Sequence, residues 1–149
     1  MKTEVNPIFF LVAEDNLADR LLLQKAMEAN GIENSLFVKD GQDLVDLLSG
    51  RLNPKPFDRS LPALILLDLN MPRLNGRETL KILKGDLQLK KIPIVVLTTS
   101  RNPEDVVTSY DGGASSFFTK PVDFQDLVEM VGLLKDYWMR TAELPGGLS

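Results

Sequence analysis

The stretch that decides the fold spans residues 63–76 and reads A-L-I-L-L-D-L-N-M-P-R-L-N-G. The apolar run 64–67 ends abruptly at Asp68, and the turn-forming segment 70–76 follows. A continuous apolar run of this length is typical of a strand buried on both faces, as in a parallel sheet covered by helices. We therefore expect Asp68 at the carboxyl edge of such a sheet, where open α/β folds bind ligands. Strand ends often carry aspartate, so Asp68 alone does not indicate a reactive carboxylate. The residues at the other strand ends must be considered with it.

Length and composition fit one globular domain. The chain has 149 residues, of which 44% are hydrophobic and 26% charged, and we expect a single domain over 1–149 with a core of about 7–140 and a tail at 141–149. A net charge of −4 and a pI of about 4.9 give no electrostatic footprint for nucleic acid or an anionic membrane. The apolar run 8–13 is too brief for a signal or membrane-spanning segment, so we expect a cytoplasmic protein.

The chain contains neither cysteine nor histidine, and this absence excludes much chemistry. Disulfides, thiol nucleophiles, Cys-ligated or His-ligated metals, Ser-His-Asp catalysis and a role as phosphohistidine carrier are all ruled out. Carboxylate, hydroxyl, lysine and backbone groups remain. Among metal ions, Mg²⁺ is the natural companion of such an oxygen-rich set.

Five apolar strand patterns alternate with five helical patterns along the chain. This alternation predicts an α/β protein with a parallel sheet, helices on both faces and right-handed crossovers. The segment 49–62 holds three prolines and is expected to be a surface loop. The expected strands are 8–13, 35–38, 64–67, 94–97 and 116–119, and the helices follow each of them, with Asn102 and Asp123 as N-caps of the last two.

Complementary polar groups stand at four of the five strand ends: Glu14 and Asp15, Asp68, Thr98, and Lys120. Each has a plain explanation by itself, since acids suit helix starts and threonine suits strands. Together they form a set. Adjacent carboxylates repel unless a cation lies among them, and Mg²⁺ prefers a few carboxylates with waters and phosphate. Such a site would stabilise a phosphoryl group that moves onto the Asp68 carboxylate.

Four motifs carry a family resemblance: E-D-N, D-L-N-M-P-R-L-N-G, V-L-T-T-S and F-F-T-K-P. In this order and strand context they resemble the receiver domain of two-component response regulators, over nearly the whole chain. The resemblance implies a flavodoxin-like (βα)5 fold, a doubly wound five-stranded parallel sheet of order 2-1-3-4-5. The phosphorylation pocket would then lie where the strand order reverses.

The same resemblance implies a role for each pocket residue. Asp68 would accept a phosphoryl group from the phosphohistidine of a histidine kinase, and Thr98 and Lys120 would contact the phosphoryl oxygens. Phe117 takes the switch aromatic position, and because it has no hydroxyl we hypothesise a packing switch in which Phe117 fills space that an inward movement of Thr98 opens. The implied ligands of Mg²⁺, for which Mn²⁺ or Ca²⁺ could substitute, are Glu14, Asp15, Asp68 and the backbone carbonyl of Asn70.

A narrower resemblance concerns the loop 49–62, the V-V-L-T-T-S segment and the Y-W-M-R-T-A-E-L-P ending. These are similar to the phytochrome-associated response regulators of cyanobacteria, which implies a phytochrome-type kinase and a homodimer through the face of the fourth helix, fifth strand and fifth helix. The alternative is that Trp138 folds back onto its own domain. The residues expected to form the dimer patch are Val106, Val107, Tyr110, Tyr137, Trp138 and Met139.

These observations predict a stand-alone receiver that is not an enzyme and whose output is protein contact. One rival is a Mg²⁺-dependent phosphatase with an aspartyl-phosphate intermediate. That chemistry usually needs a second acid to protonate the leaving group, and the residue two after Asp68 is Asn70. A binding module that is never phosphorylated is disfavoured because every pocket residue is present. Arg73 and Arg77 are expected to be solvated charges near the site.

Overall fold

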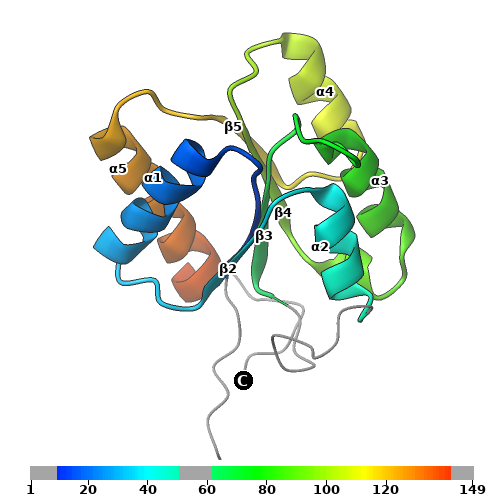
Figure 1. Ribbon diagram of the computed structural model, residues 1–149, viewed down its shortest axis with the longest axis horizontal. Coiled ribbons are helices and arrows are strands. Elements are labelled where there is room, and N and C mark those ends of the chain that lie inside the picture. Colours follow the sequence, from blue (N-terminus) through cyan, green and yellow to red (C-terminus); the bar gives the residue numbers. More distant parts are fainter. Residues whose placement is uncertain (1–9, 51–61, 142–149) are drawn as a thin grey trace, which may run out of the picture.

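The computed structural model describes residues 10–50 and 62–141, and its centre is a five-stranded sheet of order β2-β1-β3-β4-β5 (Figure 1). All neighbouring strands run parallel. The expected doubly wound, flavodoxin-like arrangement is confirmed. The strands are β1 (Phe10–Ala13), β2 (Ser35–Val38), β3 (Leu64–Leu67), β4 (Ile94–Thr98) and β5 (Ser116–Thr119).

Three sequence expectations fall partly outside the described residues. The first two residues of the expected strand at 8–13 lie there, as do most of the loop 49–62 and nearly all of the tail 141–149.

Helices cover both faces of the sheet. Figure 1 shows α1 and α5 on one face and α2, α3 and α4 on the other. None of the helices in the described part of the chain is both long and apolar enough to cross a membrane. The helices are α1 (Leu17–Ala29), α2 (Gly41–Leu48), α3 (Gly76–Gly85), α4 (Pro103–Asp111) and α5 (Phe124–Lys135), with a short 3-10 helix, η1 (Leu89–Lys91), and a π-helix, η2 (Asp136–Thr141).

The apolar runs of the strands supply the core. In β3, Leu64 and Leu66 belong to the core cluster under α1 and α5, while Ile65 and Leu67 belong to the cluster under α2 and α3. Consecutive side chains of a strand point to opposite faces, so a strand covered on both sides must be apolar throughout. This requirement explains why β3 shows no alternation in sequence, and Asp68 is the first polar residue after the strand.

Side-chain caps fix where each helix begins after its strand. Asn75 forms a reciprocal capping box with Glu78, and the expected caps Asn102 and Asp123 are confirmed. A cap satisfies one of the N–H groups that the first helical turn leaves without a partner. Short loops therefore connect strand ends to helix starts, and these loops carry the polar residues at the carboxyl edge.

The C-terminal segment bears on one expectation. Trp138 and Met139 are partly buried and pack against the core cluster under α1 and α5, so their own domain covers part of each side chain. The alternative in which Trp138 folds back onto its own domain holds. Tyr137 is 55% exposed, and its ring packs edge-on against the Trp138 ring with 4.9 Å between the ring centroids. Helical periodicity alone did not show which apolar side chains of this segment would be covered.

Candidate functional site

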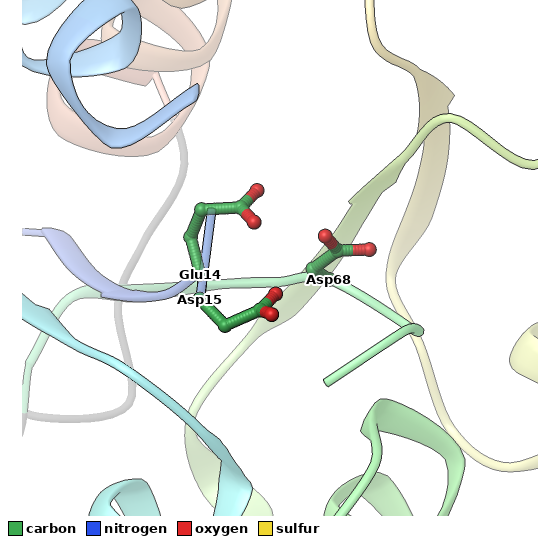
Figure 2. Close-up of side chains that lie close together, drawn as sticks. All are labelled: Glu14, Asp15 and Asp68. Carbon is green, nitrogen blue, oxygen red and sulfur yellow. The ribbon is translucent and has the colours of Figure 1, made fainter. Parts of the chain in front are cut away.

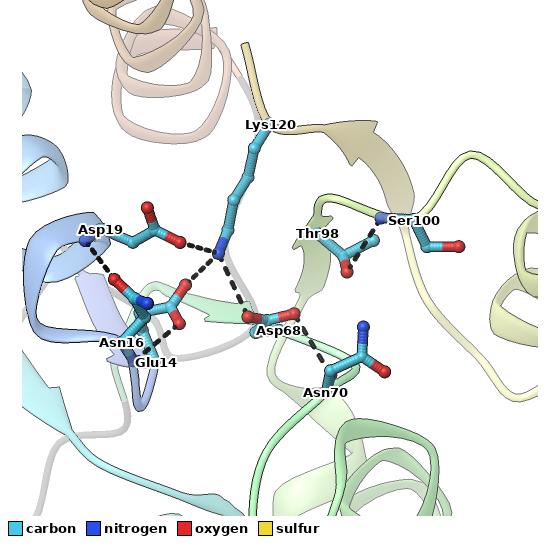
Figure 3. A network of polar contacts seen from close by, with 8 residues as sticks. All are labelled: Glu14, Asn16, Asp19, Asp68, Asn70, Thr98, Ser100 and Lys120. Atoms are coloured by element: carbon cyan, nitrogen blue, oxygen red, sulfur yellow. Dashed lines mark hydrogen bonds and ion pairs between the residues drawn. The ribbon is translucent and has the colours of Figure 1, made fainter. Parts of the chain in front are cut away.

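Polar residues from the ends of β1, β3, β4 and β5 gather at the carboxyl edge of the sheet (Figure 3). Register brings the first two together: Ala13 pairs with Leu67, and the N–H of Asp68 donates to the Ala13 carbonyl at 3.2 Å. Glu14 therefore follows β1 directly beside Asp68. The neighbouring strands β1 and β3 form the point at which the strand order reverses, where the sequence places the pocket.

Three carboxylates face one another at this edge (Figure 2). Glu14, Asp15 and Asp68 each offer an oxygen within 4.8 Å of the others. Glu14 and Asp68 are buried, whereas Asp15 is exposed. Three carboxylates at this spacing, one of them open to solvent, fit a divalent cation that takes oxygen ligands and keeps waters. The donor set thus agrees with Mg²⁺.

The ammonium group of Lys120 binds this acidic cluster. It donates hydrogen bonds to Glu14, to Asp68 Oδ2 at 3.1 Å, and to Asp19 Oδ2 at 2.9 Å (Figure 3). Asp19 was not among the residues singled out from sequence. It lies in the first turn of α1, where its N–H donates to the side chain of the N-cap Asn16. In the sequence, the one feature that pointed to Asp19 was its position as an acid in the first helical turn after E-D-N.

Burial and charge act against each other on the two central groups. Burial, together with the charge of Asp68, raises the pKa of Glu14 to about 7, although hydrogen bonding from Lys120 and the Asn16 N–H lowers it. Burial lowers the pKa of Lys120, but its bonds to Glu14 and Asp19 and the charge of Asp68 outweigh burial and raise that pKa above its ordinary value. Lys120 is therefore a fixed positive charge at neutral pH.

The expected hydroxyl and turn residues lie around Asp68. Thr98 is fully buried at the end of β4, and its carbonyl accepts the Lys120 N–H at 2.7 Å. Its Oγ1 accepts the N–H of Ser100 at 3.4 Å. Figure 3 shows Thr98 and Ser100 on the side of Asp68 away from Glu14. The N–H of Asn70 donates to Asp68 Oδ1 at 3.2 Å and so orients the carboxylate.

Phe117 of β5 is partly buried and packs against the core cluster under α2 and α3. Its N–H donates to the hydroxyl of Tyr110 in α4 at 3.2 Å. The side chain of Phe117 is thus directed inward from an edge strand, and its backbone is linked to α4.

Arg73 and Arg77 are exposed, as expected of solvated charges near the site, and both also form ion pairs. Arg73 donates to Asp40 at 2.8 and 3.0 Å and to Asp43 at 2.6 Å. Its φ of 62° is unusual for a residue with a side chain. These bonds tie the β3–α3 loop to the start of α2. Arg77 pairs with Asp105 at 2.7 Å and links α3 to α4.

Gly76 lets α3 begin directly against the strand end that carries Asp68. A Cβ at this position would lie 2.2 Å from the Asp68 carbonyl oxygen and 2.5 Å from the Leu69 Cα. The Gly76 N–H donates to the Leu69 carbonyl at 2.9 Å. This close approach explains the glycine at the end of the motif that opens the sequence.

The structure is a doubly wound α/β domain with an acidic pocket at the carboxyl edge of its sheet, and residues 10–132 match the model of the response regulator receiver domain. The chain belongs to the response regulator receiver family. Response regulator Rcp1 of Synechocystis sp. is 38% identical over 147 residues, which cover 97% of this chain and 99% of Rcp1.

Solved structures give the same assignment. The chain resembles the phosphorylated cyanobacterial phytochrome response regulator RcpA with a TM-score of 0.85 and 36% identity, over 94% of this chain and 99% of RcpA. The Mn²⁺-bound form of Rcp1 gives a TM-score of 0.82 and 36% identity, over 93% of this chain and 99% of that one. These comparisons give no support to the rival hypothesis of a phosphatase.

Proposed function

We propose that the chain accepts a phosphoryl group from a sensor histidine kinase onto Asp68 and signals through protein contacts. The observation that carries this proposal is the Lys120 ammonium, which donates to both Glu14 and Asp68. It sets a positive charge against the carboxylate that would carry phosphorus, beside acids that fit a divalent cation. Membership of the receiver family supports the same role.

In the proposed reaction, one oxygen of the Asp68 carboxylate attacks the phosphorus atom of the kinase's phosphohistidine. The phosphorus–nitrogen bond breaks, its electron pair stays on the imidazole nitrogen, and an acyl phosphate forms on Asp68. Lys120 and the Thr98 hydroxyl contact the phosphoryl oxygens and offset their charge. Because this chain contains no histidine, the phosphohistidine must belong to the partner.

The side chains of Glu14, Asp15 and Asp68, with the backbone carbonyl of Asn70, would hold Mg²⁺. Mn²⁺ or Ca²⁺ could substitute, since both accept oxygen ligands. When bound, the ion neutralises charge on the carboxylates and on the phosphoryl oxygens. The Mn²⁺-bound form of the relative Rcp1 supports a divalent ion in this pocket.

Phosphorylation would bias an equilibrium between two arrangements of β4, α4 and β5. Thr98 moves toward the phosphoryl group, and Phe117 fills the space that Thr98 leaves. The partial burial of Phe117 against the core supports a switch driven by packing. Crystal structures with and without beryllofluoride test this step, and one unchanged Phe117 rotamer in both would contradict it.

The partners follow from the relatives. A phytochrome-type histidine kinase is the proposed donor, because RcpA is a phytochrome response regulator. Since such a kinase would draw on ATP, we propose a cytoplasmic location for the chain. The chain would act as a single receiver domain over 1–149.

A homodimer through α4, β5 and α5 is the proposed assembly, supported by the exposed apolar residues Val107, Tyr110 and Leu133. Sedimentation that finds only monomers at high concentration, with and without phosphorylation, would contradict the dimer.

The decisive experiment is phosphotransfer from a purified phytochrome-type kinase and ATP, with phosphoramidate as a second, kinase-independent donor. Wild type should take up label in the presence of Mg²⁺, and Asp68→Asn should take up none. Asp111→Asn, which changes an exposed carboxylate on α4, is the matched control and should be labelled like wild type. Equal labelling of wild type and Asp68→Asn would show that the acceptor lies elsewhere.

A further inference from the structure

A groove of about 410 Å³ lies between α3 and α4, away from the acidic pocket. Both helices cover the same face of the sheet (Figure 1). The groove is in the size range of ligand sites, which are mostly apolar with a few placed polar groups. Six of the residues that line it are Arg77, Leu80 and Lys81 of α3, and Thr108, Ser109 and Gly112 at the end of α4.

Ser109 supplies a polar group that lacks a partner. The residue is only 2% exposed, and its hydroxyl oxygen is the one buried side-chain polar atom in the described part of the chain without a hydrogen bond. An unpaired buried hydroxyl lowers stability, and a bound oxygen acceptor would remove that penalty. Ser109 lines the groove, but its hydroxyl oxygen exposes less than 1 Å² of surface, so an acceptor from an occupant of the groove would reach it only after neighbouring side chains move apart.

The charges around the groove are all positive. Arg77, Lys81 and Lys84 line it and no acidic residue does, although the chain as a whole has a net charge of −4. Lys84 is committed to the carbonyls of Lys90 and Ile92. Lys81 is exposed and has no ion-pair partner within 10–50 and 62–141. The groove therefore complements an apolar group that carries negative charge.

We propose that this α3–α4 groove binds an acidic segment of a partner protein. A leucine-type side chain of the partner would lie over Leu80, and an adjacent carboxylate would accept hydrogen bonds from Lys81 and the Ser109 hydroxyl. The inference rests on the proposed function in one respect. An output through protein contact favours a protein segment over a free carboxylate.

A chain of side-chain and backbone contacts connects the groove to the phosphorylation pocket. Arg77 pairs with Asp105 at 2.7 Å, and the same carboxylate accepts the Ser100 hydroxyl at 2.5 Å. The Ser100 N–H donates in turn to Thr98. A movement of Thr98 toward a phosphoryl group would shift Ser100 and Asp105 and release Arg77 for the partner's carboxylate. Phosphorylation should thus tighten binding, and binding should favour the phosphorylated arrangement by the same factor.

The test titrates the ¹⁵N-labelled full chain with the peptide acetyl-Leu-Glu-Glu-Leu-amide and follows amide chemical shifts. Saturable shifts are expected at Thr108, Ser109 and Gly112, and Lys81→Gln should weaken binding about fivefold. Lys25→Gln, a charge change on the opposite face in α1, is the matched control and should bind as wild type does. No shift at these amides up to about 10 mM peptide would overturn the proposal.

Two further arms separate the alternatives. If hexanoate binds the groove and the peptide does not, the proposal that the occupant is a protein segment is wrong. If acetyl-Leu-Lys-Lys-Leu-amide causes equal shifts, the groove does not select for negative charge. Beryllofluoride with Mg²⁺ should raise the peptide affinity of wild type about fivefold and leave Asp68→Asn unchanged. If beryllofluoride perturbs the pocket amides but not the peptide affinity, the coupling is wrong. If it perturbs no pocket amide while the peptide still binds, the proposed function fails and the groove assignment stands.

Discussion

The ammonium of Lys120 lies 3.1 Å from Asp68 Oδ2 and also bonds to Glu14 and Asp19. One cation therefore serves three carboxylates, and the exposed carboxylate of Asp15 adds a fourth at the same edge. The pocket keeps an excess of negative charge that a divalent cation would reduce. Lys120 both orients Asp68 and competes with that cation.

Because of this competition, Lys120→Met should raise the affinity for Mg²⁺ but lower the rate of phosphoryl uptake. Removal of the positive charge should raise the Mg²⁺ affinity by about tenfold, or about 1.4 kcal/mol, in calorimetric titration. The rate of phosphoryl uptake from phosphoramidate should fall about a hundredfold, because one donor to the developing charge is lost. Lys25→Met on the exposed side of α1 should change neither quantity. A parallel loss of both would mean that Lys120 only maintains the fold.

Asp15 tests the metal site with little risk to the fold. Its side chain is exposed and makes no hydrogen bond or ion pair with the described residues. Asp15→Asn should change the free energy of unfolding without metal by less than about 0.5 kcal/mol. Mg²⁺ at a hundred times its Kd should stabilise wild type by about 2.7 kcal/mol and the variant far less, in urea unfolding at equal Mg²⁺. Equal stabilisation of both proteins would remove Asp15 from the ligand set.

The pair of Asp40 and Arg73 should make stability depend on acid pH. Burial raises the pKa of Asp40, but hydrogen bonds from Arg73 and the Asp43 N–H outweigh it, and the pKa lies below its ordinary 3.8. The carboxylate thus stabilises the fold above pH 3.8, and that contribution is lost as the pH falls below this value.

Two variants separate the contributions of Asp40. Asp40→Asn keeps an N-cap but should flatten the acid limb of a plot of urea midpoint against pH. Asp40→Ala also removes the cap of α2 and should lose about 1 kcal/mol more. An acid limb unchanged in Asp40→Asn would show that other carboxylates cause it.

Gly76 and Gly85 give a matched pair in one helix. Gly76→Ala would put a Cβ 2.2 Å from the Asp68 carbonyl oxygen, so the strand end must shift and the free energy of unfolding should fall by more than about 3 kcal/mol. A Cβ on Gly85 meets nothing within 4 Å, and Gly85→Ala should stabilise by about 0.5 kcal/mol. Thermal unfolding of both variants checks this contrast, which equal effects would contradict.

The fold was predictable because apolar runs that stop at a polar residue mark buried parallel strands. The segment 64–67 before Asp68 shows this most clearly, and the same rule placed Glu14, Thr98 and Lys120 at one sheet edge. This rule could not predict which side chains of different elements contact each other. Lys120 donates to Asp19, which is 101 residues away in sequence, and Arg73 donates to Asp40, which is 33 residues away.

The C-terminal aromatics show a second limit. Trp138 and Tyr137 are adjacent in sequence, yet Trp138 packs on the core and Tyr137 faces solvent. Periodicity identifies an apolar stripe but not whether the same chain or another covers it. Both residues lie in the π-helical turn η2, which no sequence pattern marked.

The hydrogen bond from the Phe117 N–H to the Tyr110 hydroxyl has a consequence for how copies of the chain can associate. β5 is an outer strand, and a free outward N–H there would be a template for adding a strand from another molecule. The tyrosine hydroxyl occupies this donor from within the same chain. Growth of a continuous intermolecular β-ribbon is therefore blocked at that position.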